Sequence, residues 1–279
     1  MTDIVHEHHR RNDTTRDRWE TMAPHRARVM QLVAAARAVA GPSLCILGAG
    51  NGNDVELSTL AGEFERIALV DLDEQALARA IEPVTEDQRR RVELHAPIDL
   101  TGMLPILEVW KAGTAFANEE LANAISAARI ARPAISGEFD VVASTGVLSQ
   151  LLDSVYLGVP ADHPRRAELV LAVRNRHLEI MIELLKPSGV GVLITDFVAT
   201  ETAPELARLD DSQIPAAAVH WINERNFFTG TNPYAIRDLL VGLVDGDLAV
   251  ENVRVSPAWR WDIGAKQMAV CAVTFQRCG

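Results

Sequence analysis

A glycine-rich turn directly after an apolar run is the feature that most restricts how this chain can fold. The run covers residues 44–47, and Gly48, Gly50 and Gly52 follow it on alternate positions. An apolar run that ends in glycines predicts a buried strand, a tight turn and the start of a helix. Glycines let the backbone bend sharply and approach a ligand closely. An ordinary strand-to-helix turn with no ligand has the same pattern.

A second apolar run, residues 67–70, ends in an acid. This acid, Asp71, lies 19 positions beyond Gly52. In a nucleotide-binding βαβ unit, an acid at the end of the second strand can accept hydrogen bonds from both ribose hydroxyls. Asp73 is better placed as the N-cap of the helix that follows. The alternative is that both aspartates are caps.

Two classes of cofactor use this pair of features, and the spacing of the glycines distinguishes them. The dinucleotide fingerprint is G-x-G-x-x-G, whose turn holds a pyrophosphate at a helix N-terminus. Here its third glycine would fall on Asn53, and Asp54 would add a negative charge close to the pyrophosphate. Because like charges repel, the pattern favours a cofactor that has no phosphate.

The turn over residues 48–54 resembles the first motif of the class I S-adenosylmethionine-dependent methyltransferases. In that family the glycine turn packs under the methionine part of the cofactor, and the acid after the second strand holds the ribose. The methionine amino group is a cation, which tolerates nearby acids and carbonyls. The resemblance therefore implies S-adenosyl-L-methionine as cofactor, bound by Gly48, Ala49, Gly50, Asn51, Gly52, Asp54, Asp71 and Leu72.

The third predicted strand, residues 92–95, leads to a further polar position. In the family, a polar residue after this strand reads the adenine amino group. Asp99, followed by Leu100, stands at the matching place in this chain. The competing interpretation is that Asp99 caps a helix that starts near Thr101.

The fourth predicted strand covers residues 139–146 and ends in small polar residues. The family places the transferred methyl group and the substrate beside this strand end, so the resemblance adds Ser144, Thr145 and Gly146 to the cofactor site. A turn at residues 186–189 then precedes a fifth strand, residues 190–196. Residues 249–255 and 267–275 form two closing strands with no long helix between them, and we expect these to be antiparallel neighbours.

These strands predict an α/β fold, a Rossmann-like three-layer sandwich. Its sheet is expected to be seven-stranded and mostly parallel, with an antiparallel last strand and added helical insertions. Residues 1–40 are read as an N-terminal arm and helix, a possible lid, and residues 41–279 as a class I methyltransferase domain. We expect a helical insertion near 101–137, with helical patterning over 116–131, and a substrate-side insertion near 199–233.

The N-terminal segment offers one further candidate for the cofactor. Arg26 follows a His- and Arg-rich stretch and precedes the main part of a predicted helix from about residue 24 to 40. Since arginine makes bidentate contacts with carboxylates, Arg26 could pair with the carboxylate of the cofactor. The alternative is that it lies on a solvated helix face.

Methyl transfer from a sulfonium is an in-line displacement, in which alignment supplies much of the catalysis. A general base is needed only when the acceptor proton has a high pKa. His220 is the first candidate base and Asp196 the second, and Tyr234 could orient the acceptor. His220 opens an aromatic and amide-rich stretch, residues 220–230, that suits a small organic substrate. No sequence pattern pairs His220 with an acid, which favours the alternative that it is an ordinary polar loop residue. No carboxylate cluster has a spacing that predicts a metal.

Composition limits the partners. The net charge of −11 argues against a nucleic-acid substrate, because phosphate binding needs clustered lysines and arginines. No apolar run is long enough to span a membrane, and the charged N-terminus lacks the apolar core of a signal peptide. The three cysteines, Cys45, Cys271 and Cys278, have no metal spacing. We therefore expect a cytoplasmic protein of unknown oligomeric state.

The sequence thus predicts an S-adenosylmethionine-dependent methyltransferase that N- or O-methylates a small organic or peptide acceptor. One alternative is a nicotinamide-dependent oxidoreductase, which would use the same kind of βαβ unit to bind its cofactor. The missing third glycine and the lack of a Tyr-x-x-x-Lys pair weigh against it. A non-catalytic module that keeps the cofactor site is the other.

Overall fold

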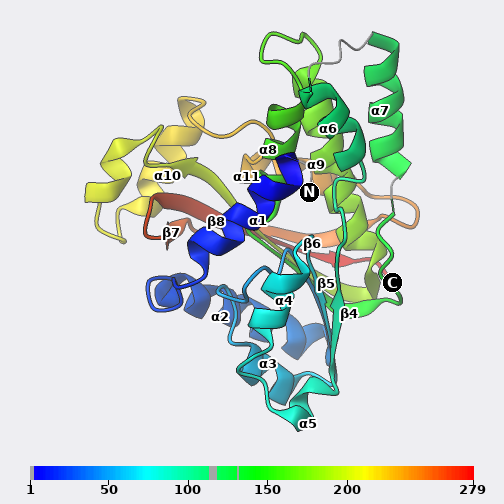
Figure 1. Cartoon of the computed structure of the whole chain (residues 1–279). Coiled ribbons are helices and arrows are strands. Elements are labelled where there is room, and N and C mark those ends of the chain that lie inside the picture. The colour runs from blue at the N-terminus through cyan, green and yellow to red at the C-terminus, as the bar shows by residue number, and fades with distance from the viewer. Residues whose placement is uncertain (1–2, 113–117, 131) are drawn as a thin grey trace.

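The structure is a computed structural model that describes residues 3–112, 118–130 and 132–279. One twisted sheet runs through the middle of the molecule, with helices on both of its faces (Figure 1). Its strands, in chain order, are β1 Ser43–Leu47, β2 Arg66–Val70, β3 Val92–His95, β4 Phe139–Thr145, β5 Leu185–Ala199, β6 Val250–Val255, β7 Trp259–Asp262 and β8 Gln267–Arg277.

The strand order is β3-β2-β1-β4-β5-β8-β6, and β7 pairs with β8 beside this path. The pairs from β3 through to β5 are parallel, whereas β8 runs antiparallel to β5, β6 and β7. This order confirms the predicted α/β class and the antiparallel closing strands. Across the described residues the sheet has eight strands rather than seven. The additional strand, β7, has only four residues, too few for a periodic signal.

The helices, in chain order, are α1 Asp3–Thr15, α2 Ala23–Ala40, α3 Leu57–Glu63, α4 Glu74–Ala80, α5 Glu86–Arg89, α6 Leu104–Lys111, α7 Asn118–Ile130, α8 Leu148–Gly158, α9 Arg166–Glu183, α10 Ile214–Asn223 and α11 Pro233–Val241, with a 3₁₀ helix, η1, at Pro204–Arg208. The predicted insertion near 101–137 holds α6 and α7. Phe116 and Ala131, the ends of its predicted helical pattern, lie outside the described residues.

Side chains that alternate along the central strands build two cores. On β1, Cys45 and Leu47 join the core under α6, α8 and α9, whereas Leu44 and Ile46 join the core under α2 and α3. Strands that are buried on both faces read as continuous apolar runs, which is why the pattern of β1 was recognisable. The three layers hold the carboxyl ends of the parallel strands at one edge of the sheet.

The segment after β5 packs separately. Leu206, Ile214 and Trp221 form a third core with Phe197 of β5 and Cys271 of β8. This core fixes the predicted substrate-side insertion on the antiparallel end of the sheet.

The N-terminal segment, expected as an arm, is the helix α1, and it crosses the carboxyl ends of the strands (Figure 1). Its N-terminus is held by Glu108 of α6, whose carboxylate accepts the backbone N–H groups of Asp3, Ile4 and Val5. A carboxylate is favoured there because the first N–H groups of a helix have no partner within it. The side chain of Ile4 is fully buried. In the part of the chain that the structure describes, no helix is long and apolar enough to cross a membrane.

Candidate functional site

Two adjoining cavities lie at the carboxyl ends of the parallel strands. The smaller, here called the turn cavity, has a volume of about 50 Å³, and its lining includes Gly48, Gly50, Asp71, Leu72, Asp99 and Leu100. The larger, here called the strand-end cavity, has a volume of about 580 Å³, and its lining includes Arg11, Ser149, Asp153, Asp196, Phe228, Trp261 and Lys266. Asn12 of α1 and Gln150 of α8 line both. The two spaces therefore share a wall.

The glycine turn forms one side of the turn cavity. Gly48 has a φ of 73°, a conformation that residues with a Cβ rarely adopt. A Cβ there would also lie 2.3 Å from Cβ of Val147, which lines the same cavity. A Cβ on Gly50 would meet Oδ1 of Asn12 at 3.1 Å. Glycine is thus needed at Gly48 both for the backbone bend and for the close approach of the fourth strand's extension.

Asp71 lies beside this turn at the end of β2. Its Oδ2 accepts the N–H of Gly50 at 2.8 Å, and its Oδ1 accepts the N–H of Asp73 at 2.9 Å. Burial raises the pKa of the Asp71 carboxyl, while these two backbone N–H groups act in the opposite direction. Each carboxylate oxygen keeps a further lone pair. The carboxylate is therefore held in place and can still accept hydrogen bonds from a diol.

The second aspartate of this segment has the other role. Asp73 is the N-cap of α4, and its side chain accepts the N–H groups of Gln75 and Ala76. The N-cap predicted for Asp73 is thus confirmed, and the contact of Asp71 with a ribose stays a prediction.

Asp99 both lines the turn cavity and caps a turn. Its Oδ1 accepts the N–H and the Oγ1 hydroxyl of Thr101, and its Oδ2 accepts the N–H of Leu104 at the start of α6. Asp99 thus holds the turn that leads into α6, although the helix begins at Leu104 with Met103 as its N-cap residue. A contact of Asp99 with adenine stays a prediction. Leu72, Ile98 and Leu104 give the same cavity an apolar side.

The remaining predicted residues of the glycine turn face α1 or the core. The side-chain amide of Asn51 donates to the carbonyl of Asn12 at 2.7 Å, and that of Asn53 donates to the carbonyl of Thr15 at 2.7 Å. These carbonyls belong to the last turn of α1, where helix carbonyls have no partner within the helix. The turn therefore caps α1. Asp54 lies 3.4 Å from Nε2 of the buried His25.

Ala49 and Gly52 line neither cavity. The N–H of Ala49 donates to the carbonyl of Val70 at the end of β2, and Gly52 packs against Ala80 of α4. Both positions shape the turn from behind.

The end of β4 is mostly internal. Ser144 is fully buried and shares a 2.8 Å hydrogen bond with Nε2 of His177. Thr145 donates to the carbonyl of Gly48 at 3.4 Å. Gly146 lines the strand-end cavity, so of the three predicted positions here it alone borders either space.

Arg26 is buried, and its guanidinium is occupied. It donates to the carbonyls of Trp19 and Asn53 and to the carboxylate of Glu56, and it lies 3.5 Å over the Trp19 ring. Arg26 therefore does not lie on a solvated helix face, and it lines neither cavity. It joins α2 to the glycine turn.

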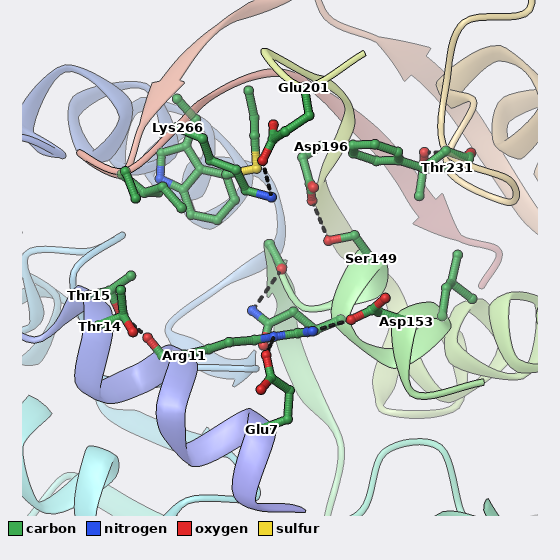
Figure 2. A pocket seen from close by; sticks show the side chains of 18 of the residues that line it. Glu7, Arg11, Thr14, Thr15, Ser149, Asp153, Asp196, Glu201, Thr231 and Lys266 are labelled. Atoms are coloured by element: carbon green, nitrogen blue, oxygen red, sulfur yellow. Dashed lines mark hydrogen bonds and ion pairs between the residues drawn. The ribbon is translucent and has the colours of Figure 1, made fainter. Parts of the chain in front are cut away.

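Asp196, near the end of β5, is the one predicted catalytic residue that reaches the strand-end cavity. Its side chain is 4% exposed and accepts the hydroxyl of Ser149 at 2.6 Å, as Figure 2 shows. Burial raises the pKa of its carboxyl, and the bond from Ser149 lowers it by less.

His220 and Tyr234 line neither cavity. The stretch expected as a loop is helical through Asn223, which leaves His220 on the exposed side of α10. Tyr234 begins α11, is 36% exposed, and lies under the guanidinium of Arg237. This placement corrects the assignment of a base and an orienting group to these two residues. Within the same stretch, Phe228 does line the strand-end cavity.

Most of the strand-end cavity was missed from sequence. Ser149, Gln150 and Asp153 come from α8, Trp261 and Lys266 come from the β7–β8 hairpin, and Arg11 comes from α1. These segments are far apart in the chain and share no motif. Among the described residues, no three His, Cys, Asp or Glu side chains are grouped to hold a metal ion.

A scan against protein-family models finds no match, and neither does a search of curated proteins. Solved structures with a similar chain trace exist. The N-methyltransferase NodS from Bradyrhizobium japonicum WM9, in complex with S-adenosyl-L-homocysteine, is 12% identical, with 90% of this chain and 86% of that chain covered and a TM-score of 0.43.

An O-methyltransferase family protein from Burkholderia thailandensis is 15% identical, with 96% of this chain and 58% of that chain covered and a TM-score of 0.45. The methyltransferase domain of bacterial CtHen1-C is 17% identical, with 91% and 98% covered and a TM-score of 0.45. At these values the functional inference rests on the residues of the two cavities.

Proposed function

We propose that this protein transfers a methyl group from S-adenosyl-L-methionine to a small organic or peptide acceptor, by N- or O-methylation. The observation that carries the proposal is the Asp71 carboxylate, held by the N–H of Gly50 at the rim of a glycine turn. The cofactor supplies a methyl group on a positively charged sulfur.

The lining of the turn cavity fits that cofactor. Asp71 would accept the ribose hydroxyls, and the apolar side formed by Leu72, Ile98 and Leu104 would hold the adenine. Gly48 and Gly50 would hold the methionine part, because they present backbone without side chains to the cavity. The strand-end cavity, which shares Asn12 and Gln150 with the turn cavity, is where the acceptor of the methyl group would lie.

In this proposal the chain's own residues align the acceptor and exclude water. Reacting atoms held at contact distance and in line account for much of the acceleration of such a displacement. In this proposal the acceptor occupies the strand-end cavity beside Gly146 at the end of β4, and the buried Asp196 is the group that would hold or take a proton.

Cofactor entry then requires α1 to move. At about 50 Å³ the turn cavity is far below the roughly 300 Å³ at which small-molecule sites begin. Asn12 of α1 fills the space over Gly50. We infer that α1, within the N-terminal segment 1–40, acts as the expected lid, whereas α2 stays packed on the methyltransferase domain of residues 41–279. The free thiols of Cys45, Cys271 and Cys278 accord with the proposed cytoplasmic location.

Isothermal titration of the full chain with S-adenosylhomocysteine, NADH and NADPH tests this function. We expect micromolar binding of the first compound only. Asp71→Asn should weaken it by about 100-fold, since two hydrogen bonds would each lose their charged acceptor at a cost of about 1.4 kcal/mol.

Asp140→Asn is the matched control. Asp140 is also a buried strand aspartate, but it binds Ser43 and Lys186 at the opposite end of the sheet. It should lower thermal stability and leave the affinity unchanged. Binding of a nicotinamide nucleotide instead would make the protein an oxidoreductase candidate. Binding of S-adenosylhomocysteine without transfer to any acceptor would indicate a non-catalytic module.

A further inference from the structure

The charged side chains that line the strand-end cavity do not balance. Four carboxylates face three cations, and the cations pair with three of the carboxylates: Arg10 with Glu7, Arg11 with Asp153 and Lys266 with Glu201. Figure 2 shows the last two pairs on either side of Asp196. Within the described ranges, Asp196 is the cavity carboxylate with no cation in ion-pair distance.

The environment of Asp196 makes this excess charge significant. Its side chain is 4% exposed and has one side-chain donor, the hydroxyl of Ser149. Lys266 and Arg11 act on it only from beyond ion-pair distance, and burial outweighs both in setting the direction of its pKa. Removing an ionised carboxylate from water is costly unless an opposite charge or several donors compensate it. A cationic ligand would supply the positive charge that the protein does not place beside Asp196.

The rest of the lining suits an organic cation. Trp261 and Phe228 line the cavity, together with Met268 and Ile263. Aromatic faces attract ammonium groups, and the apolar side chains accept a hydrocarbon body. The volume of about 580 Å³ lies within the range of roughly 300–1,000 Å³ that is typical of small-molecule sites.

We propose that the acceptor is a small primary or secondary amine, which enters as an ammonium ion and is held by Asp196 beside Trp261 and Phe228. This substrate class rests on the methyltransferase function proposed above. Before transfer, the ammonium gives one proton to the Asp196 carboxylate. The nitrogen lone pair then forms the C–N bond while the C–S bond breaks, and its electron pair stays on sulfur. The positive charge passes from the sulfonium to the methylated ammonium.

The test compares amines with alcohols of the same carbon skeleton. Pairs such as 2-phenylethylamine with 2-phenylethanol, and cyclohexylmethylamine with cyclohexylmethanol, are titrated into the full chain with and without S-adenosylhomocysteine. Ligand-observed NMR reports the dissociation constants. We expect each amine to bind at least about tenfold more tightly than its alcohol, because an ion pair in a buried site replaces a neutral hydrogen bond.

Three substitutions separate the charge of Asp196 from the other features of the cavity. Asp196→Asn keeps the shape and the bond from Ser149 and should remove the preference for amines. Glu201→Gln changes a carboxylate of the same cavity that already has a cation and should keep the preference. Ser149→Ala, which leaves the charge, should also keep it. Thermal denaturation of each variant checks that it folds.

The proposal fails if alcohols bind as tightly as amines, if no amine in the set binds, or if Asp196→Asn keeps the preference. Its failure can be told apart from failure of the methyltransferase function. If the protein prefers amines but does not bind S-adenosylhomocysteine, the amine site stands and the methyltransferase function fails. If it binds S-adenosylhomocysteine but shows no preference for amines, the methyltransferase function stands and the amine site fails.

Discussion

The two cavities are built in different ways. The turn cavity is made mainly from short continuous stretches that follow β1, β2 and β3, and backbone N–H groups orient its main carboxylate, Asp71. The strand-end cavity is made from side chains of α1, α8, β5, the segment after α10 and the β7–β8 hairpin. Recognition that depends on backbone turns leaves a local pattern in a sequence, whereas recognition that depends on distant side chains leaves none.

The two cavities also differ in how charge is compensated. Around Asp71, backbone dipoles oppose the effect of burial. In the strand-end cavity, paired side chains cancel one another, and Asp196 is left with a hydroxyl. The first arrangement is fixed by the fold and the second by side-chain identity, so substitutions should affect the two cavities differently.

The largest expected effect is at the backbone turn. Gly48→Ala adds a Cβ in a left-handed conformation and within 2.3 Å of Val147, so binding of S-adenosylhomocysteine should fall by more than about 100-fold. Gly246→Ala is the matched control, because Gly246 has a φ of 78° and nothing within 4 Å of the added Cβ. It should cost about 1–2 kcal/mol of stability and no affinity. Equal losses in both variants would mean that strain, and not the approach of Val147, explains the glycine.

The next effect concerns the polar end of β4. Burial lowers the pKa of His177 from 6.5 to about 4. The unfolded chain therefore binds a proton at His177 below pH 6.5, whereas the folded protein binds it only below about pH 4. Stability is full above pH 6.5 and should fall by about 3 kcal/mol in total as the pH drops to 4.

Urea denaturation at pH 7 and pH 4.5 measures this loss. His177→Gln should reduce it, although His8, whose pKa burial also lowers to about 4, will keep part of it. If the pH dependence is unchanged in His177→Gln, the Ser144–His177 pair is not the structural unit we describe, and Ser144 returns as a candidate for the cofactor site.

A smaller effect should follow from weakening the docking of α1, which contributes Asn12 to both cavities. Glu108→Gln removes the charge that caps α1 and touches neither cavity. Because the docked helix leaves too little room for the cofactor, the loss of about 1 kcal/mol of helix capping should tighten binding of S-adenosylhomocysteine by about fivefold. Hydrogen exchange over residues 3–15 should rise in parallel. Glu119→Gln, on the exposed first turn of α7, is the control and should change neither measurement.

The smallest effect is expected at the residue that the sequence placed first among the candidate bases. His220→Ala should leave both binding and transfer within about twofold of the original protein, because His220 is exposed on α10 and lines neither cavity. Initial rates of methyl transfer measure this. A tenfold or larger loss of the transfer rate would mean that α10 contributes to the acceptor site, which would then extend beyond the strand-end cavity.

The sequence was informative wherever a function depended on local backbone. Gly48 and Asp71 were recognisable because a strand end, a turn and an acid recur at a fixed spacing, and Asp73 because a cap precedes its helix. It failed at Arg26, whose partners Trp19 and Glu56 are set by tertiary packing. It also failed at His220, because the helical tendency of residues 214–223 overrode the expected loop.

Asp196 could be predicted from the sequence only in part. Its position at a strand end was readable, but its burial and its lack of a cation depend on α8, α1 and the β7–β8 hairpin. No single stretch of sequence contains that information.

The helix α1 gives Asn12 to both cavities, and this has a consequence for how two ligands would influence each other. If donor and acceptor each displace the docked helix, they are thermodynamically linked through it. The factor by which the donor tightens the acceptor must then equal the factor by which the acceptor tightens the donor. A chain that lacks this helix would bind the two independently. Under that condition, reciprocal cooperativity is a property that the thirteen residues of α1 confer on the whole molecule.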